Sequence, residues 1–182
     1  MTTAGLVEPA EEAAPDFVEP LVAWRVWRVV ARRGSHRLAS VVKPTLWPVG
    51  EPLVAECLRT SPLRAWWRQR RGKPRPVPDL DCVCGIYGAL ELSHVRQYLV
   101  DGPAYAAVAQ VVGEVALWGR VIECEYGFRA SHAYPRRIYV PADVGGRRRD
   151  ELLRGLAEYG VPVDPLPGRC ADAVSLTGYS SR

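Results

Sequence analysis

Two cysteines one residue apart are the residues whose types and spacing most directly suggest chemistry. They lie in the stretch DCVCGIYGA, residues 81–89, as Cys82 and Cys84. Residues at i and i+2 of a strand point to the same side, so the two thiols could share a metal ion or pair with each other. A structural zinc site needs four nitrogen or sulfur ligands, however, and these usually come as two close pairs.

A second close pair of ligands is not evident in the sequence. It would have to be drawn from Cys57, Cys124, Cys170, His36, His94 and His132, of which no two are adjacent. The redox motif CxxC is also absent. We therefore predict no metal and no cofactor. We interpret CVCG as the end of a buried strand, where Gly85 and Gly88 let the backbone turn into a helix.

Residues 117–140, LWGRVIECEYGFRASHAYPRRIYV, are the densest mixture of polar and aromatic side chains. The candidates for a ligand pocket there are Trp118, Arg120, Glu123, Arg129, His132, Tyr134 and Arg137. Arginine binds phosphate or carboxylate groups with paired hydrogen bonds, aromatic faces stack on planar groups, and Glu or His transfers protons. The alternative is structural: Glu123 and Arg129 would form a cross-strand ion pair, and Trp118 would belong to the core.

Residues 64–75, RAWWRQRRGKPR, carry six basic side chains and no acidic one around two adjacent tryptophans. This combination is typical of a nucleic-acid contact, because arginines neutralise phosphates and tryptophans stack on bases. The residues predicted to bind are Arg64, Trp66, Trp67, Arg68, Arg70, Arg71, Lys73 and Arg75. The alternative is a solvated surface loop whose tryptophans cover an edge of the core, since runs of charge alone are common.

Catalysis has less support. The phosphate-binding, nucleophile-elbow and zinc-protease motifs GxGxxG, GxxxxGK[ST], GxSxG and HExxH are all absent. A small enzyme could still use Glu123, His132 or Cys84, because a nearby histidine or a helix N-terminus can activate a thiol. Nothing in the sequence brings these residues together, so we assign no catalytic residue.

Strands and two short helices must position these candidates. Period-two alternation and β-rich composition predict strands at 21–31, 37–42, 53–58, 104–118 and 120–140. Gly34 marks a hairpin turn, and Gly113 and Gly119 mark bulges or sharp bends. Helices are predicted at 89–100 and at 148–159. This order predicts an α+β fold, with a strongly bent antiparallel sheet or small open barrel and two short helices.

The 182 residues suit one domain with loose ends. We predict a disordered acidic leader at 1–20, a single α+β domain at 21–167 and an extended tail at 168–182. A basic, proline- and tryptophan-rich connector at 59–80 lies within the domain. The leader holds five of the 20 acidic residues and no base, which leaves 15 acids against all 24 basic residues. It could solubilise the chain or screen a basic surface.

Composition argues against several classes of protein. No apolar run approaches the roughly 20 residues of a membrane helix, and the N-terminus does not resemble a secretory signal. Five irregularly spaced cysteines are too few for a disulfide scaffold and would stay reduced in a cytosol. Almost all bases are arginine, which suggests a high-GC bacterial genome. We expect a cytoplasmic bacterial protein with no membrane partner.

These patterns favour a non-catalytic binding module that contacts nucleic acid through the basic segment and the aromatic-arginine residues. The alternative is a protein-partner adaptor or an oligomerising structural protein, because two adjacent tryptophans on a loop are costly to leave in water. The small enzyme is the further alternative.

Overall fold

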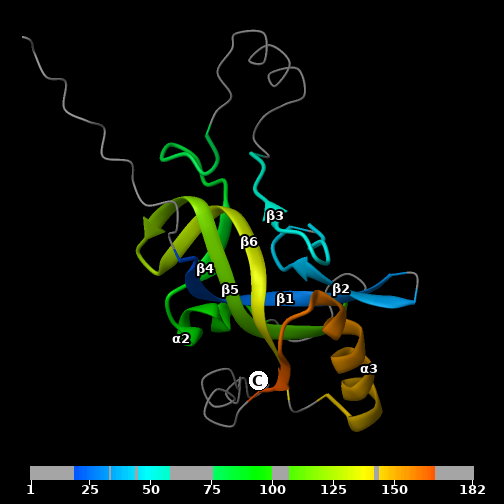
Figure 1. Cartoon of the computed structure of the whole chain (residues 1–182). Coiled ribbons are helices and arrows are strands. Elements are labelled where there is room, and N and C mark those ends of the chain that lie inside the picture. The colour runs from blue at the N-terminus through cyan, green and yellow to red at the C-terminus, as the bar shows by residue number, and fades with distance from the viewer. Residues whose placement is uncertain are drawn as a thin grey trace, which may run out of the picture.

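The computed structural model describes residues 19–32, 34–43, 45–57, 76–99, 107–141 and 144–166. Within these ranges, seven strands form one sheet, accompanied by two short α-helices (Figure 1). The predicted nucleic-acid-binding residues 64–75 lie outside the described residues. So do the predicted tail at 168–182 and all but the last two residues of the predicted leader.

The first hairpin forms as predicted. Strand β1 (Leu21–Arg32) pairs with β2 (Ser35–Ser40) in antiparallel register. Trp27 and Val29 of β1 belong to the main core cluster, whereas Val26 belongs to a second, smaller cluster. Since successive side chains of a strand point to opposite faces, β1 is covered on both sides.

A long hairpin forms the greater part of the sheet. Strand β5 (Ala107–Cys124) pairs with β6 (Gly127–Val140), and the chain reverses between them. The predicted bend at Gly119 is a bulge inside β5: the register shifts between Trp118 and Val121, and Gly119 has a φ of 74°. Glycine adopts this left-handed conformation without steric cost, so β5 continues past the position where its end was predicted.

Strand β4 (Ile86–Ala89) pairs with both β1 and β6. Strand β5 pairs with the same two strands, so β4 closes the strongly bent sheet. Hydrogen bonds therefore run in a ring through β1, β4, β6 and β5. Two short strands add to β6: β3 (Leu53–Val54), shorter than the predicted 53–58, and β7 (Val163–Pro165), which is parallel to β6. The predicted α+β class with a bent, mainly antiparallel sheet is confirmed.

The two helices differ in how well the sequence predicts them. Helix α3 (Gly146–Leu156) continues into a 3-10 turn (Ala157–Tyr159) and ends at Gly160, as predicted. Helix α2 (Leu92–Val95), also followed by a 3-10 turn, is much shorter than the predicted 89–100 and has no side-chain N-cap bond. No helix of the described residues is long and apolar enough to cross a membrane.

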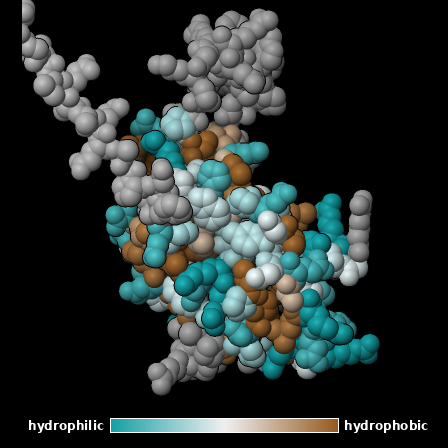
Figure 2. Space-filling model, viewed as in Figure 1, coloured by the Kyte–Doolittle hydropathy of each residue, from teal (hydrophilic) through white to brown (hydrophobic). Residues whose placement is uncertain are grey.

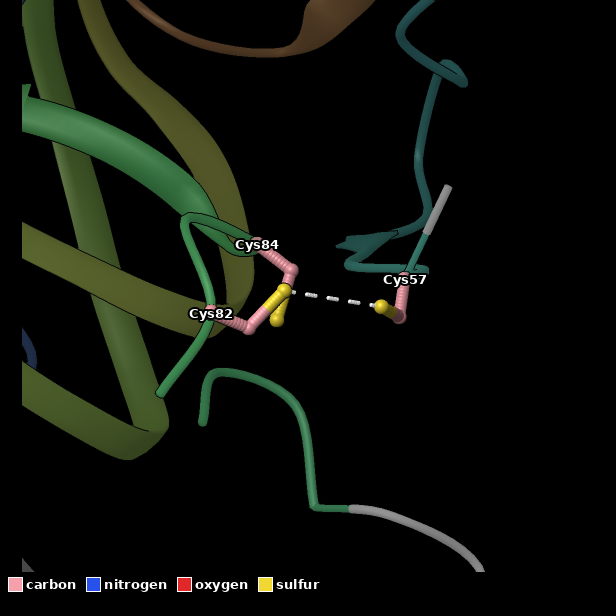
Figure 3. A group of neighbouring side chains, drawn as sticks. All are labelled: Cys57, Cys82 and Cys84. Atoms are coloured by element: carbon pink, nitrogen blue, oxygen red, sulfur yellow. Dashed lines mark hydrogen bonds between the residues drawn. The ribbon is translucent and has the colours of Figure 1, made fainter. Parts of the chain in front are cut away.

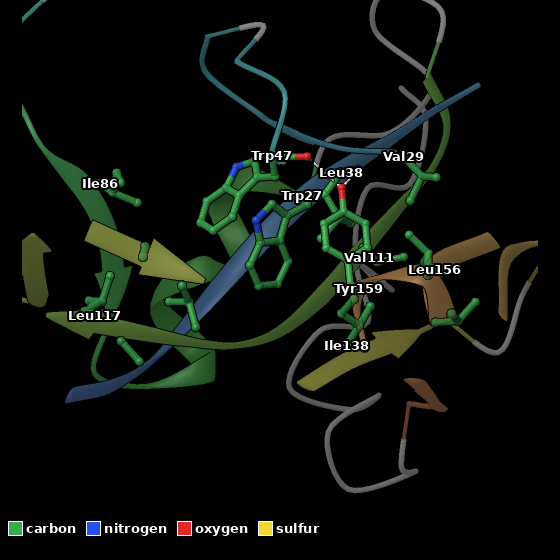
Figure 4. Packing of buried hydrophobic residues seen from close by; sticks show 14 of the residues in the cluster. Trp27, Val29, Leu38, Trp47, Ile86, Val111, Leu117, Ile138, Leu156 and Tyr159 are labelled. Carbon is green, nitrogen blue, oxygen red and sulfur yellow. Dashed lines mark hydrogen bonds between the residues drawn. The ribbon is translucent and has the colours of Figure 1, made fainter. Parts of the chain in front are cut away.

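Trp27 and Trp47 form the centre of the main core (Figure 4). Their rings meet edge to face, with centroids 5.5 Å apart and an interplanar angle of 88°. The Tyr159 hydroxyl donates a hydrogen bond to the Trp47 carbonyl at 2.9 Å and accepts one from the Leu38 amide at 2.9 Å. The 3-10 turn that follows α3 is thereby fixed to β2 and to the loop after β2.

Candidate functional site

A turn before β4 brings Cys82 and Cys84 to the same side. Its first residue is Asp79: the carboxylate accepts a hydrogen bond from the Asp81 amide (2.9 Å) and the carbonyl accepts one from the Cys82 amide (3.1 Å). Aspartate stabilises turns in this way. CVCG therefore leads into a strand, and the prediction of a strand that ends and turns into a helix is wrong, because IYGA pairs with β6.

Gly85 makes the close passage into β4 possible. Its φ is 126°, a value that L side chains rarely adopt, and an added Cβ would lie 3.1 Å from the Cβ atoms of both Arg129 and Pro78. The expected burial of Cys84 and Ile86 is found, with exposed fractions of 9% and 5%.

Cys57 approaches the same point from a segment distant in sequence. Strand β3 pairs with β6, and the Ala55 amide donates to the Ser131 carbonyl at 2.8 Å, which places the residue two positions later beside the turn. The Sγ atoms of Cys57 and Cys82 are 3.7 Å apart (Figure 3). All three sulfurs, including that of Cys84, lie within 4.8 Å of one another. We call this group the three-cysteine cluster.

A buried arginine binds the backbone of the turn that carries Cys82 and Cys84. Arg129 of β6 is 8% exposed, and its Nη1 donates hydrogen bonds to the carbonyls of Asp79 (3.0 Å), Cys82 and Cys84 (3.2 Å). These acceptors are neutral backbone groups. The alternative prediction, a cross-strand ion pair between Glu123 and Arg129, is wrong. Arg129 lies opposite Ile122, and Glu123 lies opposite Phe128.

Burial keeps the Cys84 thiol protonated. It raises the pKa of Cys84, as does the adjacent Cys82 thiol, and a backbone hydrogen bond from Asp79 partly opposes the shift. Burial also raises the pKa of Tyr87, which Arg129 partly offsets. Without a metal, Cys84 is therefore a neutral thiol at neutral pH, and a neutral thiol is a poor nucleophile.

An open depression of about 320 Å³ lies beside the cluster. It is lined by Leu80, Asp81, Cys82, Val83, Tyr87, Cys124 and Arg129. Leu80 and Val83, which line it, are 73% and 72% exposed. Figure 2 shows hydrophobic and hydrophilic surface interspersed at this end of the molecule.

Four of the seven predicted pocket residues gather near this turn. Trp118 and His132 face each other across β5 and β6, with stacked rings 6.0 Å apart at 21°. The His132 Nδ1 lies 2.8 Å from the Ser131 hydroxyl. Arg120 donates from Nε to the carbonyl of Pro78 at 2.7 Å, and Arg129 holds the turn itself.

The remaining three lie elsewhere. The Tyr134 hydroxyl donates a hydrogen bond to the Tyr159 carbonyl (2.9 Å) and accepts one from the Gly50 amide (2.8 Å). Its ring packs against the main core cluster, so its role is structural. Arg137 forms an ion pair with Asp164 at 3.1 Å. Glu123 is exposed near the tip of the hairpin.

Cys57 is the residue of this site that the sequence did not identify. It was one of six possible extra ligands, and only the pairing of β3 with β6 selects it. One signal in the sequence could have identified Cys57. Cys57 and Cys82 lie just before and just after the basic connector at 59–80, and they would meet if the two ends of that connector were close in space.

Models of protein families, curated proteins and solved structures give no match to this chain. The functional argument therefore depends on the geometry of the chain itself.

Proposed function

We propose that this protein is a non-catalytic nucleic-acid-binding module of the bacterial cytoplasm, with residues 64–75 as its phosphate-contacting segment. The carrying observation is that the chain on either side of this segment is fixed to the β5–β6 hairpin. Before it, Ala55 bonds to Ser131. After it, Pro78 accepts from Arg120 and Asp79 accepts from Arg129.

This attachment matters energetically. Two fixed roots reduce the conformational freedom that a basic segment would lose on binding, and ordering costs of this kind limit affinity. The Cys57 and Cys82 sulfurs, 3.7 Å apart, show that the two roots lie side by side. The segment with the six bases and two tryptophans is thus flanked by two attached stretches of chain.

The hairpin offers a second contact next to these roots. Trp118 and His132 form a stacked pair beside Arg120, and nucleic-acid bases stack readily on aromatic rings of this kind. Arg120 would remain available for one phosphate through the nitrogens that do not bind Pro78. The proposed interface therefore combines a basic segment with a stacking surface.

The test is fluorescence anisotropy with labelled single-stranded RNA and DNA over a series of salt concentrations. We expect affinity to fall steeply with salt, because each neutralised phosphate releases counterions. The double variant Arg70→Gln with Arg71→Gln should reduce the slope of log K against log salt by about 1.4, at about 0.7 per phosphate on a single strand.

Arg147→Gln is the matched control. This arginine is 95% exposed on α3 and pairs with Glu151 in the next turn, so it should leave the slope unchanged. Binding that is insensitive to salt, or an equal effect of the control, would contradict the proposal.

A protein-partner adaptor is the second candidate, favoured by the exposed Leu80 and Val83 beside Tyr87. The variant Trp66→Ala with Trp67→Ala separates the two. Loss of oligomeric mass with unchanged nucleic-acid binding would select the adaptor, and loss of nucleic-acid binding alone would select the first proposal. The third candidate is a small enzyme. If Cys84→Ser has no effect in any assay, an enzyme that uses the Cys84 thiol is excluded.

A further inference from the structure

We propose that Cys57, Cys82 and Cys84 bind one zinc ion through their three thiolates. This departs from the sequence-based expectation of no metal, and it does not depend on the nucleic-acid proposal. The thiols would release their protons to solvent as the ion binds, and a solvent molecule would occupy the fourth position.

The distances fit a tetrahedral site. With zinc–sulfur bonds of about 2.3 Å, neighbouring sulfurs of a tetrahedron lie about 3.8 Å apart. The Sγ atoms of Cys57 and Cys82 are 3.7 Å apart, and the third sulfur lies within 4.8 Å of both. Small side-chain rotations would complete the triangle. A disulfide, by contrast, needs about 2.05 Å and a rearrangement of both side chains.

The cluster is also preorganised, because two elements distant in sequence are fixed to one strand. Cys57 and Cys82 are 25 positions apart. Cys57 comes two residues after Ala55, whose amide donates a hydrogen bond to Ser131 of β6. Cys82 lies in the turn whose carbonyls Arg129 of β6 holds. Figure 3 shows the side chains of Cys57 and Cys82 directed toward each other from separate segments.

The charge balance is the independent observation. Arg129 is a buried cation, and the hydrogen bonds from its Nη1 end on neutral carbonyls, a costly arrangement for a charge removed from water. Zinc with three thiolates carries a net charge of −1. A zinc-thiolate centre would thus place a compensating negative charge close to Arg129.

Native mass spectrometry of the full chain, purified from zinc-supplemented cells without chelators, tests the site. We expect one zinc ion per chain, lost in each of Cys57→Ser, Cys82→Ser and Cys84→Ser. The matched controls Cys124→Ser and Cys170→Ser should keep it. A metal-free wild type, loss of zinc in either control, or a mass lower by two hydrogens, which would indicate a disulfide, would overturn the proposal.

Thiol alkylation of the wild-type chain avoids any folding defect of the variants. Iodoacetamide is applied with zinc or with a chelator, and modified peptides are quantified. Zinc should slow the modification of Cys57, the half-buried member of the cluster, several-fold and leave Cys124 unchanged. Equal modification of Cys57 under both conditions would overturn the proposal.

Discussion

The region around Trp47 and Tyr159 and the region around the three-cysteine cluster differ in the kinds of polar side chain that they bury. In the first, the Tyr159 hydroxyl bonds to two backbone groups, and the Trp47 indole donates to the Ser40 hydroxyl at 3.1 Å. In the second, three thiols face one another above a buried cation. Thiols are weak hydrogen-bonding groups, so the contacts among the three cysteines are weak one by one. The first region has its own unmet groups, because the buried Arg25 Nε and Trp27 Nε1 have no hydrogen-bond partner among the described residues.

Each region contains one enclosed arginine, and the two are used differently. Arg25 lies over the Trp47 ring with its guanidinium carbon 5.0 Å from the centroid, and it bonds to Ser40 and the Tyr87 carbonyl. Burial lowers its pKa to about 10, so it stays a cation at neutral pH and gains a cation–π contact. Arg129 donates to three backbone carbonyls. Both arginines therefore bond to neutral groups, and the difference between the regions is that the cysteine region brings together three side chains that could bind a metal ion.

Trp27→Ala should break the tryptophan region with the largest effect. Trp27 is fully buried, and its loss leaves a cavity beside Trp47, so we expect the free energy of unfolding to fall by about 3–5 kcal/mol. Urea denaturation measures this. The loss should be the same with zinc and with chelator, and a loss that zinc reverses would show that the regions are not separate.

Gly113→Ala should disrupt the pairing of β5 with β6. A Cβ at this position would collide with the Arg137 carbonyl oxygen across the sheet. We expect a loss of about 1–3 kcal/mol in the free energy of unfolding, typical of overpacking. Gly146→Ala is the control, since nothing lies within 4 Å of its added Cβ. Equal stability of the two variants would refute this account of the hairpin.

Tyr159→Phe isolates the hydrogen bonds of the tryptophan region. It leaves the Leu38 amide and the Trp47 carbonyl without their partner, which should cost about 1–2 kcal/mol. Tyr98→Phe, at an exposed position, should change the free energy of unfolding much less. Thermal and urea unfolding of both variants provide the comparison.

Alkaline pH should give the smallest effect. Burial raises the pKa of Tyr159, so the folded chain holds this proton more tightly than the unfolded chain does. Its contribution is fully present below about pH 10, the pKa of an unperturbed tyrosine, and is lost as pH rises through the folded pKa. Unfolding at a series of pH values should show a weaker alkaline loss in Tyr159→Phe. Parallel profiles would argue against the assignment.

Local patterns predicted much of the fold. Period-two alternation identified β1, β2, β5 and β6, and two glycines marked the bulge at Gly119 and the end of α3. The sequence did not predict which distant strands pair. Residues 86–89, IYGA, form β4, where a turn into a helix was predicted, because β1 and β6 pair with them. For the same reason the spacing of the cysteines did not distinguish Cys57 from the other possible ligands, and only its position at the edge of the basic connector could have singled it out.

Within the candidate site, residue types were easier to predict than their roles. Trp118, Arg120, Arg129 and His132 were identified together, yet Arg129 was expected at a ligand or at Glu123 and instead holds the turn of Cys82 and Cys84. Such a role depends on which backbone carbonyls converge, and side-chain type alone carries no information about that.

The most direct test of the difference between the two regions is amide hydrogen exchange of the wild-type chain, followed by mass spectrometry, with zinc and with chelator. The account predicts that chelation accelerates exchange in peptides covering residues 53–57 and 79–89 and leaves residues 107–117 unchanged. Exchange that is insensitive to zinc, or that rises uniformly along the chain, would contradict a cysteine region completed by a metal.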